Sequence, residues 1–173
     1  KYKKRILLVG EKLNQNNLDG IYITNLTNVK YLTGFTGSAG SVLILNESQY
    51  FFSDTRYDVQ SKEQVKHCEV HMIKTGYEQL IKDLNIIKND MKIGFESEHT
   101  SYNSYNILKK IIFNAKWNPT KQIIEHIAAV KDNKEIESLK SAIEVTDEVF
   151  KQIIPELKEG AIEKEIAAKI SYL

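Results

Sequence analysis

The chain has few of the features that mark secreted or membrane proteins. Its 173 residues include one cysteine, Cys68, so no disulfide can form within the chain, which is typical of a reducing compartment. No apolar run approaches the roughly 20 residues that a bilayer-spanning helix needs. The run Ile6-Leu7-Leu8-Val9 is too short for the hydrophobic region of a signal peptide. These absences predict a cytoplasmic protein that does not bind a membrane.

An excess of charge of one sign is also missing. The chain has 24 Lys and Arg residues against 23 Asp and Glu residues, a formal net charge of +1. Such a balance provides no field to attract nucleic acid, so we expect no nucleic-acid partner. The basic start, Lys1-Tyr2-Lys3-Lys4-Arg5, is interpreted as a solvated helical turn rather than a nucleic-acid-binding arm. With 42% hydrophobic residues, the chain can bury a core without metals or disulfides.

What is present is an alternation of helical and strand patterns. Apolar residues at helical spacing predict a first helix that ends near Gln15. Short β-branched and aromatic runs predict strands at 21–24, 42–45, 50–52, 69–73 and 92–95. Helical patterns cover 55–65, 77–87 and 102–113. Residues 46–49 suit a hairpin, so we predict a layered α/β fold with a mixed sheet.

The pattern changes after Trp117-Asn118-Pro119, beyond which only helix is predicted. Asp132 and Glu135 suit a capping box at the start of a long helix that Pro155 and Gly160 end. A second helix is expected from 161 to 173. The long helix carries an apolar stripe at alternating three- and four-residue spacing, made of Ile136, Leu139, Ile143, Thr146, Phe150 and Ile153. We therefore divide the chain into an α/β domain at 1–120, a linker at 121–131, and the opening helices of a truncated second domain at 132–173.

A glycine-rich segment, Gly34-Phe35-Thr36-Gly37-Ser38-Ala39-Gly40, could suggest a phosphate-binding loop. Its glycines recur every third residue and no Gly-Lys-Ser/Thr follows, so it matches no nucleotide fingerprint. It is not a nucleophile elbow either, because Thr36 stands where that motif requires glycine before Ser38. The segment is interpreted as a tight surface loop that exposes its backbone.

Other reactive residues do not assemble into a catalytic or metal site. His67 and His71 could share an ion on a helix, but this stretch is predicted to be a strand. A strand rises about 3.3 Å per residue, which would place the two histidines roughly 13 Å apart. Asp54 and Asp58 flank Arg56 and are interpreted as helix caps with local charge pairs. No nucleophile, base and oxyanion donor are found together.

The run Asn28-Val29-Lys30-Tyr31-Leu32-Thr33-Gly34-Phe35-Thr36-Gly37-Ser38 strongly resembles the amino-terminal domain of the creatinase/prolidase family, which includes Xaa-Pro aminopeptidases and Xaa-Pro dipeptidases. Further resemblances follow in the family's order. They are Phe52-Ser53-Asp54-Thr55-Arg56-Tyr57, Ile93-Gly94-Phe95-Glu96 and Lys131-Asp132-Asn133-Lys134-Glu135-Ile136. The resemblance therefore extends over nearly the whole chain.

The resemblance implies a ribonuclease-H-like α/β/α sandwich, followed by the first helices of a pita-bread catalytic domain. In the full-length enzyme, that second domain would hold two divalent metals, expected to be manganese. Their ligands would lie beyond Leu173, so the fragment itself is expected to be inactive and without a cofactor. The alternative is a stand-alone binding or scaffold module of the same fold, without peptidase activity.

The resemblance also implies a homodimer or higher homo-oligomer acting on peptides with proline second. In the family, the loop corresponding to residues 36–41 reaches a neighbouring subunit's active site. The small residues here favour an aminopeptidase over a dipeptidase. As a surface loop it is expected to tolerate bulk, such as Gly37→Trp. The candidates for substrate-pocket or subunit contacts are Asn28, Tyr31, Phe35, Thr36, Gly37, Ser38, Arg56 and Tyr57.

Overall fold

A mixed six-stranded sheet forms the centre of the first part of the chain, in a computed structural model that describes residues 1–173. The strand order is β4-β3-β2-β1-β5-β6. β2 runs antiparallel to β1 and β3, whereas β3–β4, β1–β5 and β5–β6 are parallel pairs. The strands are β1 (Gly20–Ile23), β2 (Ser41–Leu45), β3 (Gln49–Asp54), β4 (Glu69–Ile73), β5 (Lys92–Glu96) and β6 (Lys116–Thr120).

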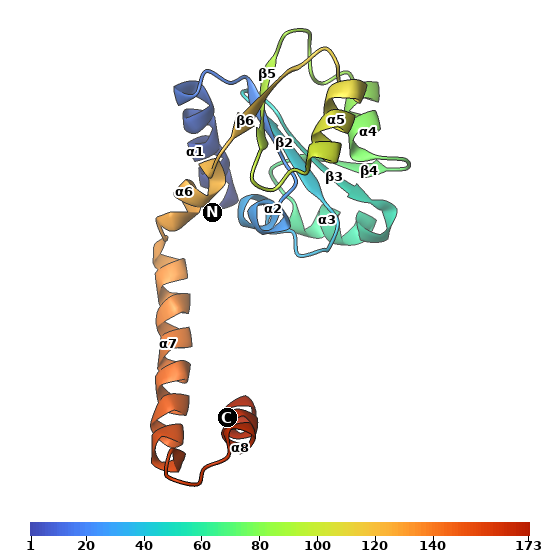
Figure 1. The fold of residues 1–173 in the computed structure, drawn as a ribbon. Helices are drawn as coiled ribbons and strands as arrows, with labels where there is room; N and C mark the ends of the chain where they lie inside the picture. Colours follow the sequence, from blue (N-terminus) through green and yellow to red (C-terminus); the bar gives the residue numbers. More distant parts are fainter. The chain divides into compact units, whose positions relative to one another are not determined.

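Helices cover both faces of this sheet (Figure 1). One face is covered by α1 (Tyr2–Gln15), α2 (Leu26–Thr33), α3 (Asp58–Gln64) and α6 (Ile123–Ala129). The other face is covered by α4 (Tyr77–Asp83) and α5 (Tyr102–Ile111). Side chains alternate between the two cores, as in β1, where Ile21 and Ile23 enter the first core and Tyr22 the second. The predicted α/β/α sandwich with a mixed sheet is confirmed.

Three parts of this fold differ from the sequence-based expectation. Helix α2 forms inside the motif run, where no helix was predicted; the Asn25 side chain caps its start and Gly34, at φ 84°, ends it. Strand β6 was missed because it contains Pro119, which an edge strand tolerates. Residues 123–129, placed in a linker, instead form α6, which buries Ile123 and Ile124 in the first core. The compact unit accordingly extends to Ala129 rather than to residue 120.

Residues 130–173 form a second, helical unit. Helix α7 (Asn133–Ile153) starts with the predicted capping box between Asp132 and Glu135. It is followed by a 3₁₀ turn (Ile154–Glu156) and by α8 (Glu163–Tyr172). The apolar stripe is largely exposed, with Leu139 at 49% and Phe150 at 61%, but Ile153 is buried at 3%. Ile153 is therefore covered within this chain, unlike the rest of the stripe. None of the helices is both long and apolar enough to cross a membrane.

Candidate functional site

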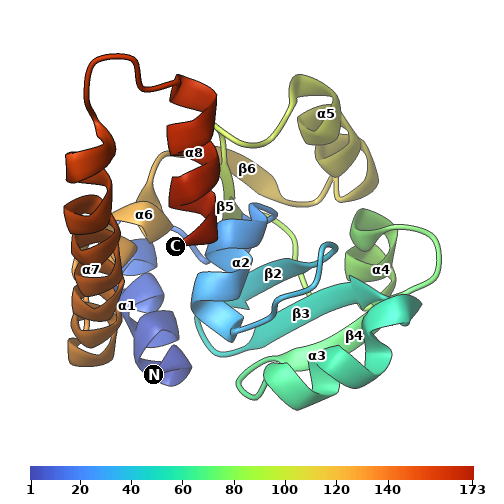
Figure 2. The same ribbon diagram turned by 90° about the horizontal axis from the view of Figure 1, so that it is seen from below.

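The connections that carry most of the predicted site residues meet at one edge of the sheet, the edge formed by the ends of its strands. The register places Ile23 opposite Val42, Ser41 opposite Phe52, and Glu96 opposite Thr120. The carboxyl ends of β1, β3, β5 and β6 therefore lie at the edge where β2 begins. This is the edge at which open α/β sheets bind their ligands. The loop between α2 and β2 runs along it from α2 towards α3 (Figures 1 and 2).

Phe35 anchors the start of this loop in the first core. Its ring is 1% exposed, and its centroid lies 4.8 Å from that of Phe51 and 5.4 Å from that of Tyr57. Its N–H donates to the hydroxyl of Thr33 at 3.1 Å. The structure thus places Phe35 among core residues, where the side chain supports the loop and is not available to a ligand.

The middle of the loop is held by two neighbouring segments. The N–H of Thr36 donates to Oε1 of Gln64 at 2.9 Å, and the N–H of Ser38 donates to the hydroxyl of Tyr57 at 3.2 Å. The carbonyl of Ala39 accepts a hydrogen bond from the hydroxyl of Ser53 at 2.6 Å. The loop was expected to expose its backbone, but the N–H groups of Thr36 and Ser38 are already hydrogen-bonded within the chain. The N–H groups of residues 37, 39 and 40 make no hydrogen bond.

Gly37 lies tightly between the Phe35 and Tyr57 rings. A Cβ at this position would lie 2.3 Å from Cζ of Phe35 and 2.8 Å from Cε1 of Tyr57. Both distances are far below van der Waals contact, and Phe35 is itself buried. The expectation that Gly37→Trp is tolerated was therefore wrong, because this surface loop is packed on its inner side.

The turn after β3 brings Arg56 and Tyr57 to the same edge. Asp54 accepts two hydrogen bonds from the Arg56 guanidinium, at 3.0 and 2.8 Å, and caps the turn by accepting the Arg56 N–H at 3.0 Å. The guanidinium thereby lowers the pKa of Asp54. The predicted cap and local charge pair are confirmed for Asp54, whereas Asp58 pairs with Lys62 at 2.7 Å. The Arg56 side chain remains 73% exposed.

Asn28 and Tyr31 lie on α2 and make inward contacts. Asn28 is 4% exposed, and its Nδ2 donates to Oε1 of Glu96 at 2.7 Å and to Oε1 of Glu125 at 2.6 Å. The Arg5 guanidinium lies 3.8 Å above the centroid of the Tyr31 ring. Sequence reasoning missed Glu96 and Glu125 as site residues. The available signal was that Glu96 directly follows the strand predicted at 92–95.

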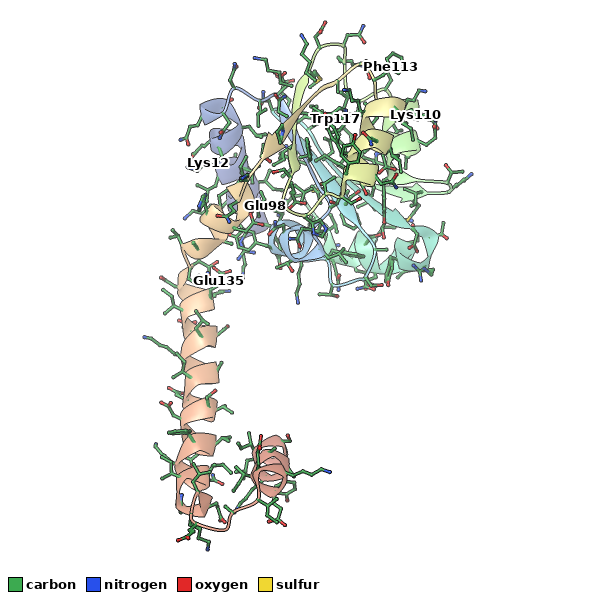
Figure 3. The ribbon with its side chains drawn as sticks, in the orientation of Figure 1. Lys12, Glu98, Lys110, Phe113, Trp117 and Glu135 are labelled. Atoms are coloured by element: carbon green, nitrogen blue, oxygen red, sulfur yellow. The ribbon has the colours of Figure 1, made fainter.

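A cavity of about 240 Å³ opens beside this network, at the ends of β5 and β6. Glu98 lies at this end of the sheet, whereas Phe113 lies at the opposite end (Figure 3). The polar residues in the wall of the cavity are Asn25, Glu96, Glu98, His99, Thr120, Gln122 and Glu125. The wall is acidic and rich in hydrogen-bond acceptors, so it suits groups that donate hydrogen bonds.

The side chains of this chain do not fit the pair of divalent metals that the family resemblance implies. No three His, Cys, Asp or Glu residues come together in a way that could hold a metal ion. His71 lies on β4, as predicted, and its Nε2 faces Glu69 at 3.0 Å. Burial raises the pKa of the Cys68 thiol to about 12, which disfavours the thiolate that a metal requires. No chemical step through a metal can be assigned to these residues.

Comparisons with known proteins match this geometry to one family. The family described as Creatinase/Prolidase N-terminal domain matches residues 5–130. A Bacillus subtilis protein described as an uncharacterized peptidase is 32% identical over 91% of this chain and 45% of its own length. A solved structure of an Xaa-Pro dipeptidase from Bacillus anthracis superposes with a TM-score of 0.90 and 27% identity, over 99% of this chain and 48% of that one.

An X-Pro aminopeptidase from Thermotoga maritima superposes with a TM-score of 0.74 and 30% identity, over 90% of this chain and 46% of that one. The chain therefore spans about half the length of these relatives. The similarity to the dipeptidase covers the second, helical unit as well as the α/β unit, since almost the whole chain is matched.

Proposed function

The chain belongs to the creatinase/prolidase N-terminal domain family, and we propose that it forms the non-catalytic amino-terminal part of a two-metal Xaa-Pro peptidase. The observation that carries this proposal is the extent of the match. The family covers residues 5–130, and the whole chain corresponds to about half of solved Xaa-Pro peptidases. The other half of such a protein would supply the metal ligands, which this chain does not contain. The parent protein would hydrolyse peptide bonds that precede proline.

In this proposal the domain shapes the substrate pocket and joins subunits of a cytoplasmic homodimer or higher homo-oligomer. The 36–41 loop would reach a neighbouring subunit's active site. Its anchoring supports this role, because Phe35, Gln64 and Tyr57 hold the loop in one conformation. The N–H groups of Gly37 and Ala39, which have no partner within the chain and are only partly buried, could then meet the substrate's polar groups.

Within the family, we propose an aminopeptidase rather than a dipeptidase. Residues 36–41 carry no charged side chain, so the loop itself has no cation to pair with the terminal carboxylate that the proline carries in an Xaa-Pro dipeptide. A longer peptide places that carboxylate farther from the scissile bond and needs no such partner. The metal is proposed to be manganese.

The test is hydrolysis by the full-length protein, assayed with an Xaa-Pro dipeptide and with an Xaa-Pro tripeptide or longer peptide. We expect turnover with added Mn²⁺, faster on the longer peptide, and none by residues 1–173 alone. Faster turnover of the dipeptide would reverse the aminopeptidase assignment. A folded full-length protein that binds metal and cleaves neither peptide would contradict the peptidase proposal and favour a scaffold module.

A further inference from the structure

The carboxylate of Glu96 holds the start of α2 at three points. Its Oε2 accepts the N–H groups of Thr24 and Asn25, each at 2.8 Å. Its Oε1 accepts a hydrogen bond from Nδ2 of Asn28 at 2.7 Å. Glu96 ends β5, so one anion joins the end of a central strand to the turn before α2 and to the helix's first turn. A negative charge also suits the positive end of the helix dipole.

Asn28 extends this contact to a third element. The same Nδ2 donates its second hydrogen to Oε1 of Glu125 on α6 at 2.6 Å. Asn28 is 4% exposed, so its amide is shielded from water and both donors are used within the protein. The three side chains, which we name the Glu96–Asn28–Glu125 lock, connect β5, α2 and α6. Charge-assisted hydrogen bonds of this kind are stronger than neutral ones.

The other end of α2 leads directly into the 36–41 loop. The hydroxyl of Thr33 donates to the carbonyl of Val29 at 2.7 Å and accepts the N–H of Phe35 at 3.1 Å. Gly34 ends the helix in the left-handed region and donates its N–H to Lys30. α2 has only eight residues, so one short helix joins the lock at its start to the loop at its end.

We propose that Glu96 is a positioning residue: through Asn28 and α2, it sets the placement of the 36–41 loop towards the substrate. This inference rests on the proposed function. Val29 and Leu32 are fully buried, so apolar packing keeps α2 folded without the lock. What the carboxylate adds is the orientation of the helix start, which packing alone defines less sharply. Asn28, the first residue of the family-like motif, then acts on the substrate indirectly.

The test compares Glu96→Gln with Glu47→Gln in the full-length protein. Glu47 is an exposed carboxylate in the turn between β2 and β3, away from the cavity and from the lock, so it is a matched control. In Glu96→Gln we expect the N–H groups of Phe35, Thr36 and Ser38 to exchange with solvent about tenfold faster, because a charge-assisted contact is lost. In the control variant these N–H groups should exchange at the wild-type rate.

Kinetics separate positioning from a loss of fold. A misplaced loop should raise KM about tenfold and leave kcat within about twofold, because a substrate contact made throughout the reaction is weakened. A merely structural role would lower kcat with the folded fraction and leave KM unchanged. If Glu96→Gln does not fold, Glu96→Asp, which keeps the charge on a shorter side chain, is judged by the same two measurements.

An unchanged KM together with unchanged exchange of the loop N–H groups, in a fully folded variant, would overturn the proposal. A change in KM and exchange equal to that of Glu47→Gln would overturn it as well. If the wild-type full-length protein cleaves no Xaa-Pro peptide, the proposed function fails by itself. The exchange comparison then still decides whether Glu96 positions the loop.

Discussion

The hydroxyl of Ser38 lies 2.7 Å from the phenolic oxygen of Tyr57, and that same oxygen accepts the Ser38 N–H at 3.2 Å. One serine thus makes two hydrogen bonds with a tyrosine across the space between the 36–41 loop and the turn after β3. When Tyr57 is ionised it accepts both bonds, so both favour the phenolate, and the hydroxyl of Ser38 is the largest cause of the lowered pKa of Tyr57.

Ser38→Ala should move the pKa of Tyr57 back towards its ordinary value. The return should be partial, since the Ser38 N–H remains as a donor. The pKa can be followed by NMR titration of ¹³C-labelled tyrosine rings, with Ser48→Ala, which removes a hydroxyl that makes no hydrogen bond, as the control. A Tyr57 pKa that is the same in wild type and Ser38→Ala would show that this contact does not persist in solution.

The same pair predicts how stability depends on pH. The pKa of Tyr57 is lower in the folded protein than in the unfolded chain, where it is about 10. Ionisation of Tyr57 therefore adds to the free energy of unfolding. This stabilisation is fully present above about pH 10 and is lost as pH falls through the folded-state pKa of Tyr57. The stability difference between wild type and Ser38→Ala should widen over that alkaline window. Urea unfolding at several pH values measures it, and a constant difference would contradict the assignment.

Gly37→Ala should destabilise the protein by about 1–3 kcal/mol, the usual cost of forcing an extra group into packed surroundings. The new methyl would lie 2.3 Å from the Phe35 ring, which cannot move outwards because it is buried. Gly10→Ala is the matched control: it lies within α1 with open space around it and should stabilise by about 0.5–1 kcal/mol. Urea unfolding curves compare the two variants. Equal stability of Gly37→Ala and wild type would show that the loop relaxes freely.

The exposed stripe of α7 should make residues 1–173 self-associate. Leu139, Ile143 and Phe150 are each about half exposed or more, and burying such a side chain contributes roughly 1.5–3 kcal/mol. In sedimentation, the measured mass divided by the mass of one chain should be greater for 1–173 than for 1–130, and Phe150→Lys should reduce this ratio. Glu137→Lys, which changes charge without removing apolar surface, is the control. A monomeric 1–173 whose α7 and α8 exchange as slowly as the sheet would contradict this prediction.

Mixing two inactive full-length variants should restore activity if the 36–41 loop acts on a neighbouring subunit. One variant is Ser38→Trp, which places bulk on an exposed side chain of the loop, and the other lacks a metal ligand in the catalytic half. A mixed dimer would then contain one site with both defects and one site with neither. If the loop serves its own subunit, every site keeps one defect. No recovery after subunit exchange, verified by mass spectrometry, would exclude action in trans.

Local patterns in the sequence were sufficient for much of this protein. The β-branched runs of β1 and β2 and the apolar periodicity of α7 depend on residues that are near neighbours in the chain. The capping box of Asp132 and Glu135 spans three residues, so it can be recognised without a fold. The motif from Asn28 to Ser38 was enough to indicate the family, because its residue types and spacing are specific.

Only the tertiary structure decided which of those motif residues face inwards. Asn28 meets Glu96, 68 residues away, and Glu125, 97 residues away, and no periodicity encodes a pair so far apart. Gly37 is intolerant of bulk because the Phe35 and Tyr57 rings pack against it from inside. β6 forms because its backbone can hydrogen-bond to β5. This pairing outweighs the poor strand propensity of the residues in β6. Local propensity is a property of the chain, but burial and partner choice arise only when distant segments pack together.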